Sequence, residues 1–137
     1  MTYEQFKTIL PRIKGKAKHL YFHLMGEPLL NRDLEKMVHD AKMAGFEVML
    51  TTNGTLLSEN GTFIYESGNV KKVSISLQAI DIIDGQPRSI YGEKLEKYLS
   101  DISDFAHQCA EKGVICSIRL WNIEKENDGK NDFIIEK

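Results

Sequence analysis

The tripeptide Gly26-Glu27-Pro28 has the residue types needed to bind an ammonium group. Glycine lacks a Cβ, so a ligand can approach the backbone closely at Gly26. Pro28 fixes its own φ and favours an extended conformation at Glu27. That conformation could aim the carboxylate and nearby carbonyl groups at a positive charge. The tripeptide also fits an ordinary turn between a strand and a helix, and taken alone it favours that simpler interpretation.

Hydroxyl and amide side chains recur where two further strands are expected to end. Thr51 and Asn53 could bind hydroxyl or carboxylate groups of a ligand. Alternatively, Asn53 and Gly54 serve only as a turn that needs a positive φ. Ser74 and Ser76 are candidate ligand contacts on the next strand, or small residues that a strand tolerates.

Arg119 is the candidate for binding an anion. It is expected on the polar face of a strand, where a partly buried charge needs a partner. Its guanidinium fork suits a ligand carboxylate, and an internal acid such as Glu47 is the alternative partner. Other side chains could line a substrate site, although a lone strand histidine more often has a structural role. These candidates are His23, Thr51, Gln78 and Trp121.

The two cysteines, Cys109 and Cys116, do not have the spacing of a metal knuckle. Both fall at apolar positions of expected elements, which predicts buried core thiols. The sequence has no recognisable Ser-His-Asp pattern, and the phosphate-binding pattern G-x-x-x-x-G-K-[ST] is absent from it. The residues therefore predict no metal site in this chain.

The elements that must position these residues alternate along the chain. A capping box at Thr2 begins a helix that Pro11 is expected to kink or stop. Asn31 is expected to cap the next helix, which Gly45 ends. Hydrophobic spacing predicts strands at 19–24, 46–52, 70–77 and 114–121, further helices at 59–66 and 92–112, and a loop between 77 and 92. This order implies parallel strands with right-handed crossovers.

The two faces of the predicted strands differ in polarity. One face is apolar and should pack under the helices: Leu20, Phe22, Leu24, Phe46, Val48, Leu50, Val73, Ile75, Leu77, Val114, Cys116, Ile118 and Leu120. The other face is mostly polar, whereas a doubly wound sheet would be apolar on both faces. We therefore expect an α/β barrel or part-barrel with helices outside and a wet interior. Ligands of α/β folds bind at the carboxyl ends of the strands.

Composition restricts the class of protein. The 137 residues fit one domain, 1–137, with residues 122–137 as a tail cut off within an element. Hydrophobic residues make up 42% and charged residues 28%, which excludes compositional disorder. A net charge of -2 argues against nucleic acid as a partner. No apolar run approaches the ~18 residues of a membrane span, and no signal peptide is visible, so we expect a cytoplasmic protein without a membrane partner.

Four segments, taken in order, resemble the radical S-adenosylmethionine (radical SAM) superfamily, especially its Fe–S oxidoreductases. They are residues 21–30 with Gly-Glu-Pro, 51–57 with Asn-Gly, 73–77 with Ser-Ile-Ser, and 117–122 with Arg119. The resemblance implies a partial (βα)6 TIM-like barrel, of which about four parallel βα units are present. It also implies an enzyme that cleaves S-adenosylmethionine (SAM) reductively with a [4Fe–4S] cluster. The 5′-deoxyadenosyl radical so formed would abstract hydrogen from a substrate.

The resemblance also implies roles for single residues. Gly26-Glu27-Pro28 matches the segment that binds the methionine amino group, although Met25 stands where the family usually has another glycine. Ser76 would contact the SAM ribose or carboxylate, and Arg119 would lie near the carboxylate. Asn53 is a further candidate for SAM binding.

The family binds its cluster through a C-x3-C-x2-C motif, which this sequence lacks. Cys109 and Cys116 are separated by six residues and cannot replace it, because three thiolates must ligate the cluster. We therefore expect an inactive fragment of a longer enzyme. By the same resemblance, that enzyme would use a reductant of the flavodoxin or ferredoxin type and a small-molecule or peptide substrate.

Two alternatives remain beside this interpretation. The chain could be a cluster-free, barrel-like domain that binds a small ligand or a partner protein. A flavodoxin-like regulatory domain is disfavoured, because no acidic cluster lies at the first strand end and the inner strand face is polar.

An incomplete barrel would leave unpaired backbone groups along the strand at 19–24. We expect dimerisation through this edge, coverage of the edge by the N-terminal segment, or poor solubility. Sedimentation tests this expectation. A soluble monomer whose edge amides are protected without any added segment would contradict it.

Overall fold

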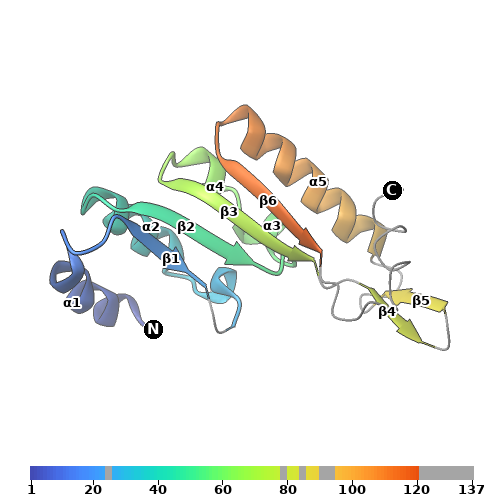
Figure 1. Ribbon diagram of the computed structural model, residues 1–137, viewed down its shortest axis with the longest axis horizontal. Coiled ribbons are helices and arrows are strands. Elements are labelled where there is room, and N and C mark those ends of the chain that lie inside the picture. Colours follow the sequence, from blue (N-terminus) through green and yellow to red (C-terminus); the bar gives the residue numbers. More distant parts are fainter. Residues whose placement is uncertain (24–25, 78–79, 84–85, 90–94, 121–137) are drawn as a thin grey trace.

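The computed structural model describes residues 1–23, 26–77, 80–83, 86–89 and 95–120 (Figure 1). Helix α1 (Tyr3–Ile13) begins at the predicted capping box, in which Thr2 Oγ1 accepts from the Gln5 amide at 3.3 Å and Gln5 Oε1 accepts from the Thr2 amide at 2.9 Å. The stop expected at Pro11 is wrong. The helix continues to Ile13, and the Lys14 amide still donates to the Leu10 carbonyl at 3.1 Å.

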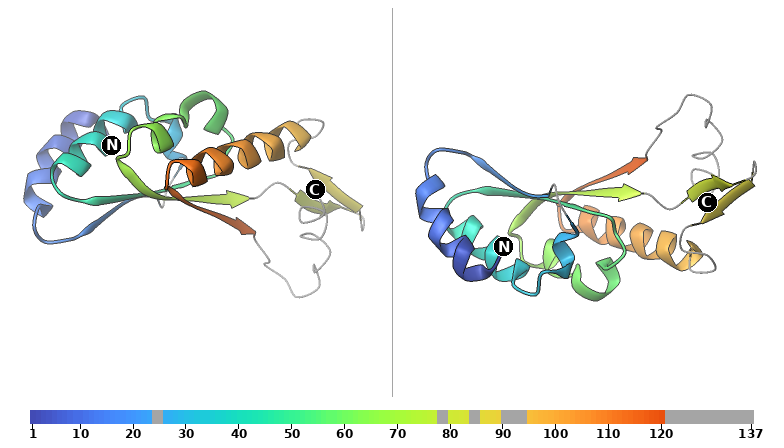
Figure 2. Two further views of the ribbon diagram at one scale, coloured as in Figure 1. Left: turned by 90° about the horizontal axis from the view of Figure 1, so that it is seen from above. Right: turned by 90° about the horizontal axis from the view of Figure 1, so that it is seen from below.

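Four parallel strands form one sheet in the order β1-β2-β3-β6 (Figure 1). The strands are β1 (His19–Phe22), β2 (Glu47–Thr52), β3 (Val70–Leu77) and β6 (Ile115–Leu120). Their connections contain η1 (Pro28–Leu30), α2 (Leu34–Met43), α3 (Leu57–Asn60), α4 (Phe63–Glu66) and α5 (Leu95–Glu111). Figure 2 shows the helices on one face of this sheet. This α/β arrangement confirms the predicted part-barrel. It places β1 at a sheet edge, where dimerisation stays a prediction.

Three local predictions differ from the structure. The helix expected at 59–66 is two short helices, because a turn at Gly61 separates α3 from α4. Asn31 does not cap α2; Asp33 is the N-cap residue, and Asn31 Oδ1 accepts from the Asp33 amide at 3.0 Å. An antiparallel hairpin of β4 (Ile80–Ile83) and β5 (Gln86–Ser89) replaces the expected loop. Pro87 favoured a loop, but a two-stranded hairpin consists of edge strands, where proline is tolerated.

The apolar strand face packs under the helices as expected. Val48, Val73 and Ile75 are fully buried in the core between the sheet and the helices. Ile118 is an exception, because its side chain is 47% exposed although the pattern placed it in the core. It belongs to the edge strand β6 and borders a cavity of about 500 Å³ beside α5. Leu24 lies outside the described residues.

Helix α5 buries a slightly different stripe from the predicted one. The sequence pattern favoured Leu95, Leu99, Ile102, Ala106 and Cys109. The buried residues are Tyr98, Ile102, Phe105 and Cys109. The buried face of the helix is therefore rotated from the predicted one and includes two aromatic side chains. Within the described ranges, no helix is long and apolar enough to cross a membrane.

Glu47 lies at the amino end of β2 among three basic side chains. Its carboxylate is 2.9 Å from Lys71 Nζ and 3.5 Å from Lys18 Nζ. The hydrogen bond from Lys71, together with the charges of Lys18 and Lys71, lowers the pKa of Glu47 to about 2 against the opposing effect of desolvation. Glu47 Oε2 is 2.9 Å from His19 Nε2 without hydrogen-bond geometry, so this contact is an ion pair only when His19 is protonated.

These ion pairs predict acid sensitivity. A carboxylate whose pKa is lower in the folded chain stabilises the fold above its ordinary pKa of 4.5, and this contribution disappears as the pH falls toward 2. Glu47→Gln should therefore lower the midpoint of urea unfolding at pH 7, and the difference from the unaltered chain should vanish near pH 2. Circular dichroism measures both midpoints. Glu111→Gln, which removes an exposed pair with His107 on α5, is the control. An equal loss for Glu111→Gln would contradict the prediction.

Candidate functional site

A cavity of about 480 Å³ opens at the carboxyl ends of the parallel strands. Parallel strands bring their carboxyl ends to one edge of a sheet, and this is where α/β folds bind ligands. The structure gathers most of the sequence candidates there. The lining residues are His23, Gly26, Glu27, Thr51, Thr52, Asn53 and Ser76.

The carboxylate of Glu27 joins the segment after β1 to the end of β2. Its Oε1 accepts from the Leu29 amide at 3.1 Å and from Thr52 Oγ1 at 2.7 Å. Its Oε2 accepts from the Asn53 amide at 2.7 Å. A carboxylate offers about four acceptor positions, so Oε2 keeps capacity for one more donor. Glu27 can therefore hold its own loop and still receive a ligand ammonium group.

Thr52, which also lines the cavity, continues this network. Its hydroxyl donates to Glu27 and also accepts from the Gly54 amide at 3.0 Å. The carbonyl of Asn53 accepts from Tyr98 Oη at 2.7 Å, which ties the same turn to α5. The backbone of Asn53 is therefore held from both sides, by Glu27 through its amide and by Tyr98 through its carbonyl.

The side chain of Asn53 stabilises its own turn. Asn53 Oδ1 accepts from the Thr55 amide at 3.0 Å and from Thr55 Oγ1 at 2.8 Å. Such a bond from an asparagine side chain to the backbone two residues on is typical of a turn. This supports the turn interpretation of Asn53-Gly54, while the position of Asn53 at the cavity keeps its NH₂ group as a candidate ligand contact.

Arg119 pairs with Ser76 across neighbouring strands. The two residues are register partners on β3 and β6, and Arg119 Nη2 donates to Ser76 Oγ at 3.2 Å. Glu47 is the wrong partner, because it lies among lysines at the amino end of β2. Arg119 is exposed rather than partly buried, so its guanidinium can still reach an anion at the cavity that Ser76 lines.

The remaining candidates fall into two groups. Thr51 and His23 line the cavity, and the His23 ring lies 5.5 Å from the Tyr21 ring in an edge-on arrangement on β1 and its continuation. Gln78 and Trp121 lie outside the described residues. Gly26 has a φ of +81°, and a Cβ there would meet nothing within 4 Å, so the backbone is open to a ligand.

The two cysteines do not fit an iron–sulfur cluster. Cys109 is buried on α5, where a hydrogen bond with Cys116 and burial raise the pKa of its thiol. A cluster needs deprotonated thiolate ligands. Cys116 pairs in register with Val73 on the core face, away from the cavity, but it is only partly buried, so the prediction of a buried thiol holds for Cys109 alone. The described part of the chain therefore holds no cluster-binding set.

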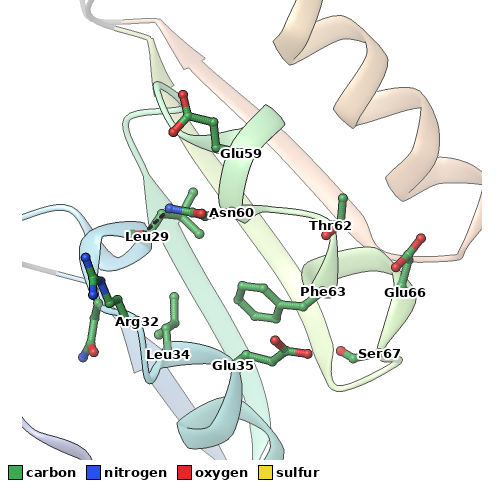
Figure 3. A pocket seen from close by; sticks show the side chains of 11 residues that line it. Leu29, Arg32, Leu34, Glu35, Glu59, Asn60, Thr62, Phe63, Glu66 and Ser67 are labelled. Carbon is green, nitrogen blue, oxygen red and sulfur yellow. Dashed lines mark hydrogen bonds between the residues drawn. The ribbon is translucent and has the colours of Figure 1, made fainter.

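A second cavity of about 510 Å³ lies on the helical side of the sheet, between η1 and α2 on one side and α3 and α4 on the other. Phe63 points into it, Arg32 and Glu66 lie on opposite sides, and Asn60 Nδ2 donates to the Leu29 carbonyl at 3.1 Å (Figure 3). Its lining includes Glu35, Glu59 and Glu66. Of the candidates predicted from sequence, none lies among its lining residues.

Two residues of the network were not predicted from sequence. Thr52 lies on the face of β2 that alternation assigns to the core, and it is only 2% exposed. A hydroxyl at a core position needs a hydrogen-bond partner. A threonine at a core-facing strand position was therefore the signal that could have identified Thr52. Tyr98 is one residue away from the predicted stripe of α5, and no local pattern connects it to Asn53.

Comparison with known proteins identifies the same class of fold. The sequence model of the Radical SAM superfamily matches residues 1–136. Of the solved structures, a crystal structure of archaeal TYW1 is 22% identical, with a TM-score of 0.57, and the match covers 97% of this chain and 46% of that one. A structure of TYW1 with a lysine-pyruvate adduct bound is also 22% identical, with a TM-score of 0.56 and coverage of 96% and 44%. None of the curated proteins compared with the sequence matches it.

The turn at Gly54 predicts a large cost of substitution. Gly54 has a φ of +82°, and a Cβ there would lie 3.1 Å from Ile75 Cγ2 and 3.2 Å from Ile102 Cδ1. Gly68→Ala is the matched control, because Gly68 has a φ of +65° with nothing within 4 Å. The control should lose about 1–2 kcal/mol from backbone strain. Gly54→Ala should lose about 1–3 kcal/mol more from overpacking. Urea unfolding measures both, and equal losses would contradict the crowding seen at Gly54.

Proposed function

The chain belongs to the radical SAM superfamily, and we propose that it forms the SAM-binding part of a radical SAM enzyme of the Fe–S oxidoreductase type. One observation carries this proposal. Glu27, a carboxylate with spare acceptor capacity, lines the cavity at the strand ends. The Arg119 guanidinium donates a hydrogen bond to Ser76, which lines the same cavity. These opposite charges suit the ammonium and carboxylate groups of a bound amino acid.

The methionine part of SAM fits this arrangement. Its ammonium group would bind Glu27 Oε2 and backbone carbonyls of the open segment at Gly26. Its carboxylate would bind Arg119, whose guanidinium fork matches two carboxylate oxygens. Ser76 would contact this carboxylate or the ribose, and Asn53 would contribute its NH₂ group. A volume of about 480 Å³ is within the usual range of ligand pockets.

The substrate would lie beside SAM on the helix-free face of the sheet. His23 and Thr51 line the cavity and would contact a small molecule or a peptide there. Gln78 and Trp121 stay sequence-based candidates for the same role. The side chains that line this cavity are largely polar, which favours a polar substrate group next to the SAM site.

The cluster would be held by a part of the enzyme other than these residues. The chain spans less than half of the length of the solved structures it matches, 46% and 44%, and its cysteines do not fit the cluster. In the whole enzyme, we propose reductive cleavage of SAM at a [4Fe–4S] centre supplied by another segment, with electrons from a flavodoxin or ferredoxin. The contribution of this chain is to bind and orient SAM.

Anaerobic reconstitution with iron and sulfide tests this proposal. UV–visible and EPR spectra are compared for the 137-residue chain and for the protein extended along its natural reading frame. A cluster in the extended protein alone supports the proposal. Absence of a cluster from both would favour the alternative, a barrel-like domain that binds a ligand without radical chemistry.

Arg119→Ala should weaken SAM binding without weakening binding of 5′-methylthioadenosine, which has no amino acid carboxylate. The loss of a charge-assisted hydrogen bond is about 1.5–3 kcal/mol, which corresponds to a Kd raised roughly tenfold or more. Isothermal titration calorimetry of the cluster-containing protein measures both affinities. The control is Arg32→Ala, because Arg32 lines the cavity on the helical side. Unchanged SAM affinity in Arg119→Ala would remove Arg119 from the site.

A further inference from the structure

Thr52 and Tyr98 form a hydrogen-bonded support under the proposed SAM site. We infer that they are positioning residues, which fix the Glu27 carboxylate and the Asn53 backbone in the geometry that receives the methionine ammonium group. This inference rests on the proposed function and deepens it. It assigns a role to one residue of β2 and one residue of α5 that the family resemblance does not single out.

The first contact is the one between Thr52 and Glu27. The Thr52 hydroxyl donates to Oε1 at 2.7 Å, and the Asn53 amide donates to Oε2 at 2.7 Å. The last residue of β2 and the residue that follows it therefore hold the two oxygens of one carboxylate. This fixes the plane of the carboxylate, and with it the direction of the remaining acceptor position on Oε2.

The Thr52 hydroxyl is buried and held by two hydrogen bonds. Thr52 is 2% exposed, so water does not replace a lost partner. Its hydroxyl hydrogen has Glu27 as its acceptor, while its oxygen accepts from the Gly54 amide at 3.0 Å. The amide thus orients the hydroxyl, and the hydroxyl orients the carboxylate.

Tyr98 supports the other side of the same turn. Its phenol donates to the Asn53 carbonyl at 2.7 Å over a separation of 45 residues, and its side chain is 7% exposed. The peptide groups on both sides of Asn53 are therefore held, one by the loop after β1 and one by α5. A shift of α5 would move the Asn53 amide that holds Glu27 Oε2.

The test compares Thr52→Val, which removes the hydroxyl at nearly constant shape, with Thr52→Ser, which keeps it. Thr62→Val is the control, because Thr62 is exposed and makes no capping hydrogen bond. The measurements are amide hydrogen exchange at Asn53 and Gly54, and calorimetric Kd values for SAM and 5′-methylthioadenosine. The second ligand lacks the ammonium group and so reports general damage to the cavity.

Thr52→Val should speed exchange at both amides and raise the Kd for SAM about tenfold, the scale of a hydrogen bond to a charged group. The Kd for 5′-methylthioadenosine should stay unchanged, and Thr52→Ser should restore both properties. Unchanged SAM affinity in a folded Thr52→Val chain overturns this inference but leaves the proposed function in place. Equal weakening of both ligands, or failure of Thr52→Ser to restore binding, also overturns it. If the unaltered protein does not bind SAM, the proposed function itself fails.

Tyr98→Phe gives an independent test if Thr52→Val does not fold. It removes the phenol oxygen and keeps the ring in the core. Tyr65→Phe is the control, since the Tyr65 ring packs against Phe105 at 5.5 Å on the same helical layer. Weaker binding of SAM, but not of 5′-methylthioadenosine, in Tyr98→Phe alone supports the inference. Identical SAM affinity in Tyr98→Phe and Tyr65→Phe contradicts it.

Discussion

The Glu27 carboxylate is the interaction on which the candidate site depends. It lies where two connections meet, and it accepts from its own loop at Leu29 and from the end of β2 at Thr52 and Asn53. A charged acceptor shared by three donors gives short, directional bonds. Among the described residues, its bonds to Thr52 and Asn53 are the side-chain hydrogen bonds that join the segment after β1 to the end of β2. This one carboxylate therefore ties together two of the segments that line the cavity.

The candidate site and the ion pairs of Glu47 lie at opposite ends of the parallel sheet. Glu47 and its lysine partners lie where β2 begins, whereas Glu27 and the pair of Ser76 with Arg119 lie where the strands end. The helices cover one face and pack the apolar core against it (Figure 2). This division leaves the polar face and the carboxyl ends for ligand binding, with a stabilising ion cluster at the opposite end.

Much of this arrangement could be predicted from the sequence, because the relevant signals are local. Alternating polarity located β3 at Val70–Leu77 without error, and strand polarity together with chain order brought Glu27 and Ser76 to one edge. The support of the site could not be predicted in the same way. Thr52 looked like a core position, and the contact of Tyr98 with Asn53 depends on tertiary packing over 45 residues. The hairpin at Pro87 was missed because local propensity favoured a loop.

Titration of the isotope-labelled chain with SAM, followed in ¹H–¹⁵N spectra, tests whether SAM binds at the carboxyl ends of the strands. The largest shift changes are expected at the amides of Gly26, Glu27, Asn53 and Ser76, which line the cavity there. The amides near Glu47, at the other end of the sheet, should stay unchanged. Changes confined to the helical-side cavity around Phe63, or no changes at saturating SAM, would show that the cavity at the strand ends is not a SAM site.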